Sequence, residues 1–217
     1  LPARVKTVRF LLPALPALAV CAAVAVAAVG ARASRLRKGA AVLVGGLTLT
    51  HGAAFSSIYS ETDSRVAAAY WLDENVTGRE TVAVEDPPGY GPPLGSPSRE
   101  IRRPDLRYEL LWRDFYTGHE RATEEERRRH LETVLRRCTW LALSEGHRAE
   151  FTAAPELRPV ESEFYRKLDA GELPFRKVKE FKSYPRLGPL VLRDDRAEVL
   201  MRVFDHPRVE IWKRVEE

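Results

Sequence analysis

The chain has 217 residues, of which 35 are lysine or arginine and 31 are aspartate or glutamate, so the formal net charge is +4. This balance is typical of a mixed, solvated surface, and it excludes a strongly basic nucleic-acid-binding protein. The two cysteines, Cys21 and Cys138, lie in different predicted environments. The sequence therefore indicates neither a disulfide framework nor a cysteine metal site, and we expect no cofactor.

Two uncharged stretches, residues 10–30 and 39–59, open the chain. Because a bilayer core about 30 Å thick is crossed by about 20 helical residues, each stretch predicts a transmembrane helix. The remainder is polar and long enough for one ordinary domain. We therefore expect a membrane α-helical region over residues 1–59, followed by a small α/β domain over residues 60–217.

The loop between the predicted spans carries four basic residues within residues 31–38. By the positive-inside rule this short loop is cytoplasmic, which places residues 60–217 on the extracytoplasmic side. Lys6 and Arg9, which precede the first span, then also lie outside, against the rule. Either the topology is different, or these cations face an anion.

In the polar part, Asp63 predicts the start of a helix over 64–75, and residues 81–85 alternate as a strand. Residues 86–104 contain six prolines and three glycines and predict an irregular loop. A helix is expected over 104–116. The sequence from Thr123 to Glu126 is a capping box that opens a helix running to about Cys138.

Residues 139–145 are typical of a buried strand, 156–170 of a helix that ends at Gly171, and 175–181 of an edge or half-buried strand. Residues 198–204 and 208–214 flank the sequence Asp205-His206-Pro207 and predict a hairpin. Helices alternating with strands favour a mixed sheet with this C-terminal hairpin at its end.

Four segments resemble a known family. Residues 6–18, KTVRFLLPALPAL, carry a basic residue, an aromatic and two spaced prolines, and residues 59–85 place an Asp-Ser-Arg helix start and a strand after the last span. Residues 164–185 and 203–214, the latter with Phe-Asp-His-Pro, complete the pattern. Together they resemble the C-terminal part of GT-C glycosyltransferases that use lipid carriers, of the dolichyl-phosphate-mannose protein mannosyltransferase and aminoarabinose transferase type.

The resemblance implies a multi-pass membrane enzyme that moves a sugar from a polyprenyl phosphate to a glycan, lipid or protein acceptor at the outer membrane face. In this family the catalytic carboxylate lies in the first outer loop. We therefore expect no catalytic residue within these 217 residues, and we expect a further membrane region before Leu1.

Lys6 and Arg9 are the candidate lipid-phosphate-binding residues. Transfer from a lipid phosphate leaves a phosphate anion, which a nearby cation stabilises without a metal. In the family resembled, the segment before this helix lies near the lipid phosphate. The alternative is that both side chains merely anchor a helix end among lipid head groups.

Glu85 and Asp86 are the candidate acceptor-side residues, because they end a strand beside the proline-rich loop. The simpler interpretation is a strand that ends at the protein surface. His51, in the second span, is an ionisable residue in a membrane helix. Its alternative role is a hydrogen bond between close-packed helices, which Gly45, Gly46 and Gly52 favour.

Two other classes of protein have the same hydropathy. One is a two-helix membrane anchor that carries a binding or sensing domain. The other is an assembly subunit of a membrane complex. The weakness of ligand-type motifs in residues 60–217 favours the glycosyltransferase over both.

Overall fold

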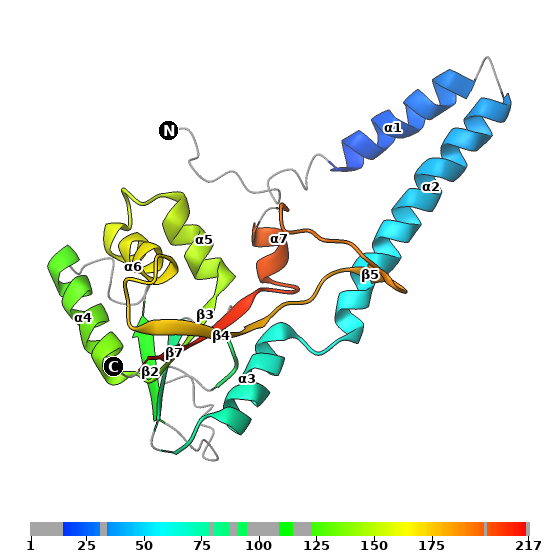
Figure 1. The fold of residues 1–217 in the computed structure, drawn as a ribbon. Coiled ribbons are helices and arrows are strands. Elements are labelled where there is room, and N and C mark those ends of the chain that lie inside the picture. Colours follow the sequence, from blue (N-terminus) through cyan, green and yellow to red (C-terminus); the bar gives the residue numbers. More distant parts are fainter. Residues whose placement is uncertain are drawn as a thin grey trace. The chain divides into compact units, whose positions relative to one another are not determined.

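The computed structural model describes residues 15–30, 34–78, 80–86, 91–94, 109–114, 123–197 and 199–215 (Figure 1). The chain forms two compact units. The first contains Leu1–Glu61 and Tyr184–Met201, and the second contains Thr62–Ser183 and Arg202–Glu217. A segment late in the sequence therefore belongs with the apolar N-terminal helices.

Apolar helices dominate the first unit. Helices α1 (Leu15–Gly30) and α2 (Ser34–Ser56) contact each other, and the 3-10 helix η2 (Ser57–Ser60) follows α2. Within the described ranges, one helical stretch, Lys38–Asn75, is long and apolar enough to cross a bilayer, judged by length and composition alone. The predicted span 39–59 falls in this stretch. Helix α1 as described has 16 residues, so a second membrane helix stays a prediction.

The first unit also contains a two-stranded hairpin, made of β5 (Arg186–Leu187) and β6 (Leu190–Val191). Its loop is Gly188-Pro189, and Gly188 has a φ of 59°. A glycine with positive φ at the first loop position is typical of the type II′ turn that joins tightly paired strands. The Arg186 N–H donates a hydrogen bond of 2.8 Å to Ser57 Oγ, which holds the hairpin at the end of α2.

The second unit is built on a five-stranded sheet with the order β2-β1-β3-β7-β4. Its strands are β1 (Thr81–Asp86), β2 (Glu109–Asp114), β3 (Trp140–Ser144), β4 (Phe175–Phe181) and β7 (Val209–Arg214). Strand β1 pairs in parallel with β2 and β3, whereas β7 pairs antiparallel with β3 and β4. The predicted mixed sheet is confirmed.

Helices cover both faces of this sheet, which gives three layers (Figure 1). Helix α3 (Ser64–Asn75) packs on one face through Leu72, against Val82 and Val84 of β1. Helices α4 (Glu124–Arg137), α5 (Glu145–Ala153) and α6 (Pro159–Asp169) pack on the other face, where Ala83 points. This alternation along β1 is the two-residue period of a strand buried on both sides.

Local sequence signals set several helix ends. The Asp63 side chain accepts a hydrogen bond of 2.7 Å from the Arg65 N–H and caps α3. Both bonds of the predicted capping box between Thr123 and Glu126 are present at the start of α4. After α6, Gly171 takes a φ of 70°, the left-handed conformation in which glycine commonly ends helices.

Two predicted elements are wrong. Residues 109–114 form strand β2, not part of a helix over 104–116, because they pair in parallel along the whole of β1. The C-terminal hairpin is absent, since α7 (Val199–Val203) is a helix where its first strand was expected. Strand β7 pairs instead with β3 and β4, which lie far from it in sequence.

Candidate functional site

Glu85 lies near the carboxyl end of β1, where the order of the parallel strands reverses. The chain places β2 on one side of β1 and then places β3 on the other side. In open α/β sheets, ligands bind outside the carboxyl ends of the strands at such a switch point. The second unit therefore has one position, between the ends of β1 and β3, that its topology singles out.

Side chains from three elements converge on Glu85. Its Oε2 accepts hydrogen bonds from the Ser144 N–H at 2.9 Å and from Ser144 Oγ at 3.4 Å. Its Oε1 accepts a hydrogen bond from the hydroxyl of Tyr165, on α6. His147 Nδ1 lies 3.5 Å from Oε2 and 3.2 Å from Ser144 Oγ. We call Glu85, Ser144, His147 and Tyr165 the switch-point cluster.

The switch-point cluster is almost completely buried. Glu85 and Ser144 are 2% exposed, and His147 and Tyr165 are 0% exposed. A buried carboxylate is costly unless hydrogen bonds replace its water, and this one receives donors on both oxygens. The cluster thus ties β1 to β3, α5 and α6 in the interior of the unit.

The cluster contains serine, histidine and a carboxylate, but it lacks the geometry of a hydrolytic triad. A triad places the serine on one ring nitrogen of the histidine and the acid on the other. Here Ser144 Oγ and Glu85 both approach Nδ1 of His147. Together with the burial of Ser144, this arrangement supports a structural role over nucleophilic catalysis.

Further buried charges surround the cluster. Glu145, which begins α5, forms an ion pair of 2.6 Å with Arg202, and both side chains are less than 10% exposed. Arg148 pairs with Glu210 of β7 at 2.6 Å and lies over the ring of Tyr165. Each of these carboxylates has a cation beside it, as burial requires.

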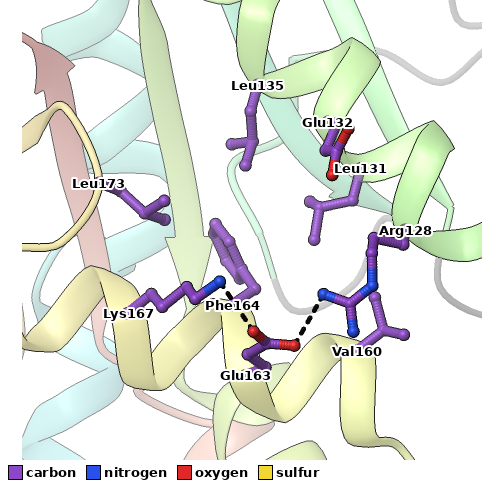
Figure 2. Close-up of a pocket in the computed structure, with 9 residues that line it drawn as sticks. All are labelled: Arg128, Leu131, Glu132, Leu135, Val160, Glu163, Phe164, Lys167 and Leu173. Atoms are coloured by element: carbon purple, nitrogen blue, oxygen red, sulfur yellow. Dashed lines mark hydrogen bonds and ion pairs between the residues drawn. The ribbon is translucent and has the colours of Figure 1, made fainter.

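A shallow pocket lies between α4 and α6, on the same side of the sheet (Figure 2). It has a volume of about 180 Å³ and is lined by Arg128, Leu131, Glu132, Leu135, Val160, Glu163, Phe164, Lys167 and Leu173. Pockets for drug-sized ligands usually span about 300–1,000 Å³. This pocket is therefore too small for a sugar attached to a lipid carrier.

Glu163 bridges two cations at the rim of this pocket, as Figure 2 shows. Its carboxylate receives hydrogen bonds from Lys167 at 2.7 Å and from Arg128 at 2.8 Å. These bonds lower the pKa of Glu163 from 4.5 to about 2. Glu163 balances one of these two cations and Glu132, which also lines the pocket, balances the other, so the lining offers no net positive charge to an anionic ligand.

The candidate residues named from the sequence have different outcomes. Lys6 and Arg9 lie outside the described residues. Asp86 ends β1, but its side chain is outside the described part of the chain. Glu85 does not end a surface strand, since its side chain is 2% exposed, so that interpretation is wrong. His51 lies on α2 with an exposed side chain.

Close helix packing at three glycines was also weighed from the sequence, and three residues of the switch-point cluster were missed. A Cβ atom placed on Gly45, Gly46 or Gly52 would meet nothing within 4 Å in the part of the chain that the structure describes, so close packing of other helices at these glycines is not seen. Ser144, His147 and Tyr165 were not singled out at all. The order of the strands would have identified Ser144, because the ends of adjacent parallel strands meet at one edge.

No metal centre is visible in the described ranges, where no group of three or more histidine, cysteine, aspartate or glutamate side chains could hold an ion. Comparisons with protein-family models, with curated proteins and with solved structures found no match to this chain.

Proposed function

We propose that this chain is the C-terminal portion of an integral-membrane glycosyltransferase that moves a sugar from a polyprenyl-phosphate carrier to an acceptor at the outer membrane face. The observation that carries the proposal is the junction after α2. Residues 59–85, which carry much of the resemblance, form a capped helix followed by a strand, α3 and β1, as the resemblance predicts. The apolar helix α2 precedes them.

Two other segments of the resemblance fit the same proposal. Residues 164–185 include the end of α6 and the whole of β4, and residues 203–214 include β7. These segments are far apart in sequence, yet β4 and β7 are neighbours in one sheet. The last three segments thus each contribute a strand to the same sheet, β1, β4 and β7, which supports reading these three together.

In this proposal Lys6 and Arg9 bind the phosphate of the carrier, and no residue of the chain is assigned to catalysis. Glu85 is not offered to the acceptor, because its carboxylate is 2% exposed and already receives hydrogen bonds from Ser144 and Tyr165. An acceptor-side role is retained as a proposal for Asp86. The second unit then lies outside the membrane and supports the active site.

Binding of the carrier tests this proposal. The chain is reconstituted in vesicles with a photoreactive polyprenyl phosphate, and covalent labelling is measured for the wild type and for Lys6→Ala/Arg9→Ala. Because a hydrogen bond to a charged group contributes about 1.5–3 kcal/mol, we expect the double variant to bind at least about tenfold more weakly.

Arg35→Ala/Lys38→Ala is the matched control, since it removes two basic residues from the loop between the predicted spans. It should label like the wild type. Equal labelling of all three proteins, or equal loss in both variants, would contradict a phosphate site at Lys6 and Arg9. A membrane-anchored binding domain would then become the better proposal, because the switch-point cluster lies where α/β sheets bind ligands.

A further inference from the structure

The hairpin of β5 and β6 exposes an apolar surface. Leu187, Leu190 and Val191 are 41%, 57% and 42% exposed, and residues 187–192 contain no charge. Leu187 lies directly opposite Leu190, so the two side chains share one face of the hairpin. Exposed large apolar side chains gathered at the tip of a hairpin indicate an interaction surface rather than a random surface position.

Hydrogen bonds and an ion pair fix the base of this hairpin within the first unit. The Arg186 N–H donates to Ser57 Oγ at 2.8 Å, and the Arg186 guanidinium lies 3.2 Å from the Glu61 carboxylate. Glu61 is the first acidic residue after the uncharged stretch 39–59. It therefore marks the level at which a membrane-spanning α2 would leave the hydrocarbon.

The hairpin lies beside the apolar helix α2. That helix exposes the large apolar side chains Val42, Leu43, Val44, Leu47 and Leu49, which only lipid or another apolar surface can cover. Strand β5 contacts both α2 and η2. The lipid or other apolar surface that covers α2 would therefore also reach the hairpin beside it.

Charged residues precede and follow the apolar tip in the sequence. Arg193 and Arg196 follow β6 with exposed side chains, and Arg186 precedes the tip. Of the acidic residues in the same segment, Asp195 accepts a hydrogen bond of 2.9 Å from the Tyr184 hydroxyl. Arg186 pairs with Glu61, and residues 193–196 carry two arginines and two aspartates, so the tip is an uncharged apolar segment bounded by polar residues, a pattern suited to the membrane interface.

We propose that the hairpin Arg186–Val191 inserts its leucine face into the head-group region of the bilayer, beside the outer end of α2. The occupant of this surface is lipid, not a protein partner. The hairpin serves as an additional interfacial anchor that is formed by a segment about 130 residues after α2, the separation of the bonded pair Ser57 and Arg186.

The test places a fluorescent probe at the tip. In a Cys21→Ser/Cys138→Ala background, Leu190→Cys is labelled with an environment-sensitive dye, and the full chain is reconstituted in vesicles of phosphatidylcholine and phosphatidylglycerol. Leu157→Cys is the matched control, because Leu157 is also a leucine, is 59% exposed and lies in the turn between α5 and α6.

We expect the dye at position 190 to emit at shorter wavelength than the dye at 157, and to be quenched strongly by lipids that carry spin labels on the upper acyl chain. The dye at 157 should emit as in water and respond little to these lipids. Water-like emission at both positions would overturn the proposal. A blue shift at 190 without quenching by the acyl-chain label would overturn it too, because the tip would then be covered by protein.

Discussion

Tyr165, on α6, donates its hydroxyl hydrogen bond to the carboxylate of Glu85, at the carboxyl end of β1, and the two side chains are 0% and 2% exposed. Their contact joins a helix of one layer to a strand of the next across 80 residues of sequence. Tyr165 donates to Oε1, whereas Ser144 donates to Oε2, so the two residues bond different oxygens of the same carboxylate.

Removal of this hydroxyl should destabilise the second unit. Tyr165→Phe removes a hydrogen-bond donor from a buried carboxylate, which costs about 1–3 kcal/mol. We expect the free energy of unfolding, followed by tryptophan fluorescence in denaturant, to fall by that amount. Tyr70→Phe is the control, since Tyr70 is 61% exposed, and it should change stability by less than about 0.5 kcal/mol. Equal effects of the two changes would exclude the proposed role of the Tyr165 hydroxyl.

The buried pair of Glu145 and Arg202 should be sensitive to the loss of either partner. Arg202→Met removes the nearer cation from a carboxylate that is 7% exposed, while Arg208 stays 4.0 Å away, and we expect a loss of up to about 3–5 kcal/mol in the free energy of unfolding. The double variant Arg202→Met/Glu145→Gln should recover part of this loss. By contrast, Arg166→Ala removes a partner of the exposed Glu172 and should cost less than about 1 kcal/mol. A double variant no more stable than Arg202→Met would argue against an uncompensated charge as the cause.

Acid should weaken the contact between α4 and α6 through Glu163. Its pKa is about 2 in the folded chain against 4.5 for the free group, because Lys167 and Arg128 hydrogen-bond its carboxylate. The unfolded chain therefore takes up the proton first as the pH falls. The stabilisation is complete above pH 4.5 and is lost as the pH falls towards about 2.

Glu163→Gln removes this titration. Between pH 4.5 and about 2, its free energy of unfolding should therefore fall less steeply than that of the wild type. Arg128→Met/Lys167→Met should show the same reduced slope, because the carboxylate then has no cation to bind. Parallel slopes in all three proteins would show that Glu163 does not contribute to the acid dependence.

The proposed orientation predicts which cysteines an impermeant reagent reaches. In the same cysteine-free background, Glu172→Cys lies in an exposed turn after α6 and should be labelled in intact cells. Arg35→Cys lies at the start of α2, on the other side of the predicted span, and should be labelled only after lysis. The reverse pattern would place the second unit in the cytoplasm and would exclude transfer at the outer face.

Elements with strong local signals could be predicted from the sequence. The capping box at Thr123 fixes the start of α4, and the uninterrupted apolar run in residues 140–143 is typical of a strand buried on both faces, which β3 is. The alternation in β4 predicted an edge or half-buried strand, and β4 does lie at an edge of the sheet. In each case a few neighbouring residues carry the whole signal.

The two wrong elements had ambiguous local patterns that distant contacts decided. Residues 109–114 place three consecutive apolar residues between charged ones, a short run that fits a helix or a strand, and pairing with β1 makes them a strand. Residues 198–204 contain leucine and methionine, which favour helices, but the turn residues that follow indicated a hairpin. Strand β7 pairs with β3 and β4, and the residues next to β7 in the sequence do not predict this pairing.

The candidate site was predictable only in part for the same reason. Glu85 could be named because it ends a strand beside a proline-rich loop. Its partners Ser144, His147 and Tyr165 lie 59 to 80 residues away, and only the order of strands in the sheet brings them together. Burial of the carboxylate likewise depends on α5 and α6, which cover that face.

The position of β7 sets a limit on when the second unit can assemble during synthesis. It is the last strand in chain order, yet it lies between β3 and β4. On a ribosome, β4 has no neighbour in the described sheet until residues 209–214 have been made, long after α2 has been synthesised. A nascent chain stopped before residue 209 should therefore carry an unpaired basic strand, and proteases should degrade it far faster than the finished protein.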